Sequence, residues 1–339
     1  MKRFITLLLL ISFGVIAYAG DVARKGTTGA DQLLIPVGAR GIATGGAFIS
    51  SVTGLEAIYY NPAGLDITRR TEGMFSQMSY IADINVAYFA AGTSLGEFGS
   101  VALSFKSIDF GDITVTTIDN PDGTGATYSP GYLTAGLTYS KIITDRVSIG
   151  ANFKVVNESI LNTSATGFAM DFGVQYRFEK NITIGAAVKN IGTNMQYTGT
   201  DLQYKVDVPG GAPGSTKGVF EVATEPFQMP SFFELSVGYD FQFDKDNKLA
   251  LAGTFVNNNA FEDQMRFGLE YGFMNMFYAR AGYNVQTENT ASSLYDLTFG
   301  AGVDYKLTDG IGLIFDYAFR QVKEFPNPNH VFTVKIAVQ

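Results

Sequence analysis

The chain has 339 residues, of which 46% are hydrophobic, 14% aromatic and 17% charged, and its net charge is −8. This apolar content is too high for a disordered chain, and the acidic balance excludes nucleic acid as a partner, because that partner requires a basic surface. The sequence has one His and no Cys. We therefore expect no disulfide, no cysteine nucleophile, no metal site of the thiolate or His-cluster kind and no cofactor.

The first 19 residues have the pattern of an export signal. Lys2 and Arg3 precede an uncharged apolar stretch that ends at the small-x-small sequence Ala-Tyr-Ala, residues 17–19. An uncleaved membrane anchor is the alternative, but an anchor needs roughly 20 apolar residues and this stretch is shorter. We therefore predict a signal peptide over residues 1–19 and an exported mature chain.

From about residue 74 onward, apolar and polar residues alternate with a period of two. In the segment 294–307, one face carries Tyr, Leu, Phe, Ala and Val, and the other carries Asp, Thr, Gly and Lys. A soluble β-sandwich alternates too, but its strands are usually only about 5–6 residues long. Long strands with a small, charged polar face and with aromatic residues at the ends of the apolar face are typical of a membrane barrel. We predict an all-β fold, a transmembrane antiparallel β-barrel of about 14 strands over residues 74–339.

The lengths of the connections provide an independent check on this barrel. We expect strands at residues 74–82, 84–93, 99–108, 130–140, 146–157, 166–178, 181–190, 230–243, 247–256, 264–273, 276–286, 294–307, 311–322 and 330–338. The connections after even-numbered strands are short, whereas those after odd-numbered strands include long ones at 109–129 and 191–229 and moderate ones at 157–165, 257–263, 287–293 and 323–329. Barrels of the bacterial outer membrane have short periplasmic turns and longer outside loops. The pattern therefore predicts a location in the bacterial outer membrane, with its lipid as a partner. The start of the first strand and the end of the last strand should both lie on the periplasmic side.

Residues 20–73 do not fit the barrel pattern. They are rich in Gly and carry short apolar stretches. The segment is too long for a linker and too apolar to lie in water, so we expect it to form a hatch inside the barrel lumen. The predicted organisation is a signal peptide at 1–19, a hatch at 20–73 and a barrel at 74–339.

Three blocks of this segment carry a family resemblance. They are Leu-Ile-Pro-Val-Gly-Ala-Arg at 34–40, Gly-Gly-Ala-Phe at 45–48 and Ala-Ile-Tyr-Tyr-Asn-Pro-Ala-Gly-Leu at 57–65. In this order and spacing they resemble the N-terminal region of the PorV/PorQ family, outer-membrane proteins of the wider FadL-like superfamily. The resemblance implies a fourteen-stranded barrel with an N-terminal hatch. The predicted hatch motif consists of Pro36, Gly38, Arg40, Gly45, Gly46, Asn61, Pro62 and Gly64.

The motif also has a physical interpretation. Pro62 biases Asn61 away from the α region and Gly64 permits positive φ, so the sequence predicts a fixed turn. We favour a structural turn that closes the hatch against the lumen wall over a latch that moves when ligand or cargo arrives. A buried charge needs a partner, so we expect Arg40 to pair with an inward carboxylate such as Asp296, Asp304 or Asp316.

Sequence patterns that resemble catalytic or binding sites are weak. The segment 211–217 superficially resembles a phosphate loop, but its Lys follows Ser and Thr instead of preceding them. The acidic segment 119–123 lacks the closing Glu of a calcium loop. Inward charges of both signs are expected to pair across the lumen. We therefore predict no catalytic residues, no metal and no enzyme activity.

Two functions and one purely structural role remain. The PorV/PorQ resemblance implies an accessory component of type IX protein secretion, which helps to bring exported proteins to the cell surface or attach them there. Its partners would be secretion-system subunits and exported proteins. The alternative, from the fatty-acid-transporter side of the superfamily, is passage of a small hydrophobic compound from outside, through the hatch, to the periplasm or laterally into the membrane.

The loop at 191–229 is the candidate binding element for either function. Exposed apolar clusters usually mark a binding surface, and this loop carries Val206, Val208, Val219, Phe220, Val222 and Phe227. The competing interpretation is that the loop folds over the barrel mouth and packs on itself.

Overall fold

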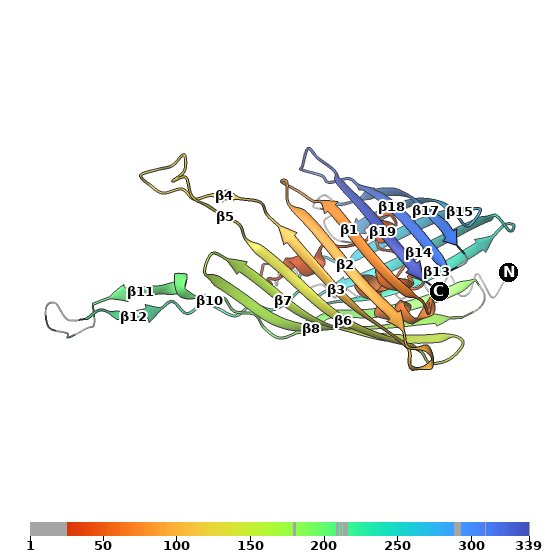
Figure 1. The fold of residues 1–339 in the computed structure, drawn as a ribbon, viewed down its shortest axis with the longest axis horizontal. Coiled ribbons are helices and arrows are strands. Elements are labelled where there is room, and N and C mark those ends of the chain that lie inside the picture. The colour runs from red at the N-terminus through yellow and green to blue at the C-terminus, as the bar shows by residue number, and fades with distance from the viewer. Residues whose placement is uncertain are drawn as a thin grey trace.

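The computed structural model describes residues 26–178, 181–207, 210, 212, 216–287, 293–308 and 310–338. The predicted signal peptide and Val208 lie outside the described residues. The described chain forms a closed antiparallel barrel (Figure 1). Its long strands are β1 (Thr71–Ser79), β2 (Asn85–Ser94), β3 (Ser100–Asp109), β6 (Gly131–Ile142), β7 (Val147–Ile160), β8 (Thr163–Arg177), β9 (Ile182–Gly192), β13 (Phe232–Gln242), β14 (Asn247–Asn258), β15 (Gln264–Phe273), β16 (Phe277–Gln286), β17 (Leu297–Thr308), β18 (Ile311–Arg320) and β19 (Asn329–Val338).

Each of these strands pairs with its neighbour in sequence, and β1 closes the barrel on β19 over the full length of both strands. The predicted count of fourteen is confirmed. β1 begins at Thr71, before the expected residue 74. The expected moderate loop at 157–165 is wrong, because β7 and β8 continue until Ile160 pairs with Thr163 and only a tight turn remains. The β8–β9 ladder contains one register shift, between Met170 and Phe172.

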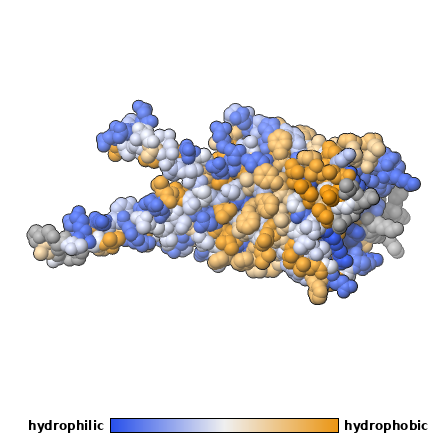
Figure 2. Space-filling view, viewed as in Figure 1, coloured by the Kyte–Doolittle hydropathy of each residue, from blue (hydrophilic) through white to orange (hydrophobic). Residues whose placement is uncertain are grey.

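The two faces of the wall follow the predicted alternation. Phe299 and Phe315 point outward and are 48% and 46% exposed, whereas their neighbour Asp316 is 4% exposed and faces the lumen. Figure 2 shows hydrophobic residues gathered over the barrel wall, while the two loops that project from it are more hydrophilic. An apolar outer face on a closed barrel suits contact with lipid.

Two long loops project from one end of the barrel, which we call the outer end (Figure 1). The loop after β3 forms the short hairpin β4 (Ile113–Thr114) and β5 (Thr127–Tyr128). The loop after β9 contains β10 (Thr198–Gly199), η6 (Thr200–Leu202), and the hairpin of β11 (Gln203–Val206) and β12 (Gly218–Glu221), which we call the arm. The arm extends away from the barrel mouth. The expectation that this loop folds over the mouth is therefore wrong for the arm. The inner end has short turns, one of which contains η5 (Gly96–Phe98).

Residues 26–70, which we call the hatch, lie inside the barrel. The hatch consists of single helical turns, η2 (Asp31–Leu34), α2 (Ala39–Ala43), η3 (Gly54–Glu56), α3 (Ala57–Tyr60) and η4 (Pro62–Ile67). Glycines and Pro62 between these turns prevent a longer helix. Among the described residues, no helix is long and apolar enough to cross a membrane.

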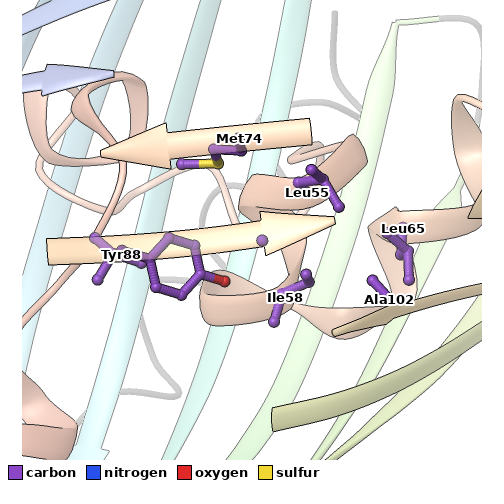
Figure 3. Close-up of a cluster of buried hydrophobic side chains, with 8 residues drawn as sticks. Leu55, Ile58, Leu65, Met74, Tyr88 and Ala102 are labelled. Carbon is purple, nitrogen blue, oxygen red and sulfur yellow. The ribbon is translucent and has the colours of Figure 1, made fainter. Parts of the chain in front are cut away.

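The hatch shares a buried core with the wall. Leu55, Ile58 and Leu65 of the hatch pack with Met74, Tyr88 and Ala102, which point inward from β1, β2 and β3 (Figure 3). α2 packs on the opposite side of the lumen against β16 to β19, and η4 packs against β6, β7 and β8. The hatch therefore touches most of the barrel's circumference.

Candidate functional site: the hatch and the lumen

Asn61 joins the hatch to the barrel wall at the inner half of the lumen. Its side-chain nitrogen donates to the carbonyl of Ile49 at 2.9 Å and to that of Val174 in β8 at 3.1 Å. Its side-chain oxygen accepts from the backbone N–H of Ala63 at 3.2 Å and so caps η4. Pro62 occupies the first position of η4, where its missing N–H costs nothing. The geometry is that of a fixed turn held against the wall.

Glycines allow this close approach. Gly64 is not among the residues with positive φ, so the expectation about its backbone is wrong. Its hydrogen side chain is needed for space instead, because a Cβ there would lie 2.0 Å from the carbonyl oxygen of Val52. On the wall, a Cβ at Gly173 would lie 1.9 Å from the side-chain oxygen of Asn61. Gly64 therefore lets two segments of the hatch pack together, and Gly173 lets the hatch approach the wall.

Arg40 makes a two-pronged ion pair with Glu270 of β15. Its Nε and Nη2 lie 2.8 and 2.9 Å from the two carboxylate oxygens. The expected pairing with an inward carboxylate is confirmed, but the examples Asp296, Asp304 and Asp316 are wrong, because the partner is Glu270. Lys323 contacts Asp296, and wall residues engage Asp316. The negative charge of Glu270 raises the pKa of Arg40 above its ordinary value.

The ion pair belongs to a chain of charges that runs around the lumen. Glu270 also lies 2.6 Å from Nε of Arg280, whose Nη1 lies 2.6 Å from Asp316. Lys335 then lies 3.1 Å from Asp316 and 3.6 Å from Glu56 of the hatch. We call this set the charge network. Because Arg40 and Glu56 are hatch residues, the network ties the hatch to four strands, β15, β16, β18 and β19.

The remaining motif residues surround α2. Gly38 and the pair Gly45 and Gly46 have φ of 82°, 65° and 73°, in the left-handed region that favours glycine. They bracket α2 and restrict it to a single turn, which points Arg40 at Glu270. Pro36 lies half-buried just ahead of this turn. The structure thus gathers most of the motif around two anchors, Asn61 and Arg40. That these residues have a functional role stays a prediction.

The outer half of the lumen contains an apolar cluster. Buried side chains from the hatch, from β7 and β8 and from the two ends of the β9–β13 loop pack together there, and we call them the outer cluster: Ala30, Leu33, Val156, Ala165, Ala169, Met195 and Met229. Phe227 packs on this cluster, with its ring centroid 5.7 Å from that of Tyr197. The structure therefore separates Phe227 from the other described candidate residues of the loop, Val206, Val219, Phe220 and Val222, which are exposed on or beside the arm.

A small cavity lies below the outer cluster. It has a volume of about 30 Å³, and Lys106, Lys154 and Lys189 from β3, β7 and β9 line it together with Asp171 and Tyr59. We call it the lysine cavity. Burial raises the pKa of the Tyr59 hydroxyl, so this residue is neutral. Sequence reasoning missed these lysines, although period two already placed them on the inward faces of their strands.

Two larger cavities occupy the inner end. They have volumes of about 390 and 240 Å³, and both are lined by Arg40 and Glu270. We call them together the inner vestibule. Neither shares a lining residue with the lysine cavity. The outer cluster and the lysine cavity are therefore separate from the polar inner vestibule.

Comparisons with known proteins bear on the fold. No protein-family model and no curated protein sequence matches this chain. Solved structures do resemble it, at 12–13% sequence identity, over 90% of this chain and 98% of theirs. They include the CymD monoaromatic hydrocarbon channel with a TM-score of 0.59, the toluene transporter TbuX of Ralstonia pickettii with 0.57 and a FadL homologue of Pseudomonas aeruginosa with 0.55.

At this identity the likeness concerns the fold, which is that of FadL-type outer-membrane channels. The structures named are channels and transporters, not enzymes. The closed barrel, its apolar outer face and this shared fold place the chain in the bacterial outer membrane. The finer resemblance to the PorV/PorQ family stays a prediction.

Proposed function

We propose that this chain lets small hydrophobic compounds pass through the outer membrane, the alternative that its sequence left open. The outer cluster is the observation that carries the proposal, because it is a buried apolar region at the outer end of a plugged barrel, in which an apolar compound can replace the packed side chains. Two of the structures with this fold are described as a monoaromatic hydrocarbon channel and a toluene transporter, and this supports the same class of compound.

The chemistry of the outer cluster suits such compounds. Leaving water for an apolar surface contributes roughly 25 cal/mol per Å² of apolar area. Met195 and Met229 have flexible side chains that adapt to ligands of different shapes. A compound bound there replaces apolar contacts of the hatch residue Leu33 with other apolar contacts, so the net change in free energy is small.

Passage then requires the hatch to move, because the outer cluster and the inner vestibule lie on opposite sides of it. The Asn61 turn and the charge network hold the hatch in the closed position. A compound that displaces the outer end of the hatch would strain these anchors and open a route to the periplasm.

Uptake of radiolabelled toluene by cells that express the chain tests the proposal. Met229→Gln places a polar amide in the outer cluster at nearly constant volume and should lower the uptake rate several-fold. The matched control is Met274→Gln, at an exposed residue of an inner turn, which should leave uptake unchanged. Equal uptake by the parent, both variants and cells without the barrel would contradict the proposal.

The arm supports a second candidate function, the accessory role in type IX secretion that the sequence resemblance implies. Val219, Phe220 and Val222 are exposed beyond the barrel, and such an apolar surface fits an exported protein. The backbone N–H of Val222 donates to the carbonyl of Leu202 at 2.9 Å, so residues 203–221 can be replaced by a short Gly linker without disturbing the loop base. Loss of surface-attached proteins with normal toluene uptake would favour secretion, and the reverse result would favour transport.

A further inference from the structure

The lysine cavity carries more positive than negative charge. Its three lysines and Asp171 are all buried. Lys154 lies 2.6 Å from Asp171, so these two charges neutralise one another. Lys106 donates to the carbonyls of Gln32 and Ile35 at 2.6 and 3.2 Å. Carbonyls accept its hydrogen bonds but do not balance its charge.

Lys189 is the residue that lacks a partner of opposite charge. Its ammonium lies 4.1 Å from the ring centroid of Tyr59 and 5.1 Å from that of Phe232. Within the described part of the chain, no oxygen accepts a hydrogen bond from it. Ring faces attract a cation, but its three N–H donors require acceptors. Of the nearby carboxylate of Glu234, Oε1 is held by Arg266 at 2.8 Å, and Oε2 is buried and accepts no hydrogen bond from Lys189.

A buried charge without such a partner is costly, and the cost is removed by an ion of opposite sign. A water molecule could accept a hydrogen bond from Lys189, but it would leave the surplus charge. Ser104 and Tyr88 also line the cavity and carry hydroxyl groups that can donate to an anion, whereas the hydroxyl of Thr134 donates to Gln32 at 3.2 Å. The requirement of the site is therefore a negative charge with several acceptor positions.

The size of the cavity restricts the ion. A single water needs roughly 10–15 Å³ of such space, and the cavity provides about 30 Å³. A hydrocarbon chain does not fit, and neither does a sugar acid. We propose that the lysine cavity binds one compact monovalent anion, a halide or the smallest carboxylate, against the ammonium of Lys189. This site is separate from the outer cluster and does not rest on the proposed transport function.

The anion would stabilise the closed barrel. It would bridge β9, which carries Lys189, to β7 and β3, which carry Lys154 and Lys106 and lie further along the same side of the wall, beneath the hatch residue Tyr59. Ligand that binds only the folded state raises its stability as the ligand concentration increases. The site should therefore be visible as an anion-specific rise in the unfolding temperature.

The test compares unfolding temperatures of the purified full-length barrel in sodium chloride, sodium formate and sodium gluconate at equal ionic strength. For the parent we expect chloride to raise the temperature by several degrees over gluconate, which is too large for the cavity. An unfolding temperature in formate equal to that in chloride would show that the site also takes a carboxylate, whereas one equal to that in gluconate would show a halide site. Lys189→Gln should remove the difference between salts, and the exposed-turn control Lys245→Gln should keep it. Equal temperatures in all three salts, or a difference that persists in Lys189→Gln, would overturn the proposal.

Crystals of the parent grown in sodium bromide provide a second measurement that does not depend on any variant folding. We expect an anomalous bromide peak beside the Lys189 ammonium, inside the lysine cavity. Water alone at that position, in crystals with bromide bound elsewhere, would overturn the assignment.

Discussion

The two halves of the lumen hold the hatch in different ways. The inner half uses ion pairs and hydrogen bonds of fixed geometry, at Arg40, Glu56 and Asn61. The outer half uses apolar packing around Leu33, together with the hydrogen bonds from Lys106 to two hatch carbonyls. Apolar packing has no preferred direction and re-forms around another apolar molecule, whereas paired charges specify one position. The apolar contacts at the outer end of the hatch are therefore suited to replacement by an apolar ligand. The ion pairs and hydrogen bonds at the inner end are suited to holding the lumen closed.

The largest effect should come from the charge network. Glu270→Gln removes the carboxylate that Arg40 and Arg280 share. Breaking a buried ion pair costs roughly 3–5 kcal/mol, and we expect the lower end of that range because the Arg40 side chain is 27% exposed. Urea unfolding in detergent measures the loss, and ion conductance in planar bilayers should rise as the hatch loosens.

The exposed residue Glu97 of an inner turn provides the control for this experiment. Glu97→Gln should change the free energy of unfolding by less than about 0.5 kcal/mol. If the two variants unfold alike and conduct alike, the charge network does not hold the hatch.

A smaller effect is expected at the other inner anchor. Asn61→Ala removes the hydrogen bonds to Ile49 and Val174 and leaves both carbonyls buried. The expected cost is about 1–3 kcal/mol. Limited proteolysis should cut the hatch faster in this variant than in the parent. An unchanged cleavage rate would show that Asn61 does not hold the hatch, and that only the charge network anchors its inner end.

The smallest effect on stability is expected from two cysteine variants. Their labelling tests whether the outer end of the barrel faces the cell exterior and the inner end faces the periplasm. Ile118 lies in the loop after β3 and is fully exposed, and Lys245 lies in an inner turn. Ile118→Cys should react with an impermeant maleimide on intact cells, and Lys245→Cys should not. The parent has no cysteine, so labelling is unambiguous. The opposite labelling pattern would reverse the outer and inner ends.

Much of the barrel could be predicted from the sequence, because the alternation of apolar and polar residues along each strand indicates which side chains face lipid and which face the lumen. Alternation placed Phe299 outward and Asp316 inward, as observed. Strand ends were less certain, because the turn at Leu161 gives no strong signal and the flanking residues can continue the ladder. The expected loop at 157–165 was wrong for this reason.

The partners of lumen residues could not be predicted in the same way. The alternation predicts that Glu270 faces inward, but the residue with which it forms an ion pair depends on how the hatch folds across the barrel. Arg40 reaches Glu270 because Gly38 and Gly45 restrict α2 to one turn. The lysine cavity and the outer cluster also combine hatch and wall residues that are far apart in the sequence.

One measurement tests the central claim that hydrophobic compounds pass only when the hatch moves. The side-chain oxygens of Ser50 in the hatch and Ser236 in β13 lie 3.3 Å apart. Ser50→Cys with Ser236→Cys is nearly isosteric and should form a disulfide, whose sulfurs lie about 2.05 Å apart, after a small adjustment. Toluene uptake should be lost in the oxidised double variant and restored by reductant, while the single variant Ser236→Cys is insensitive to both. Parental uptake through a barrel with the disulfide formed would contradict the account.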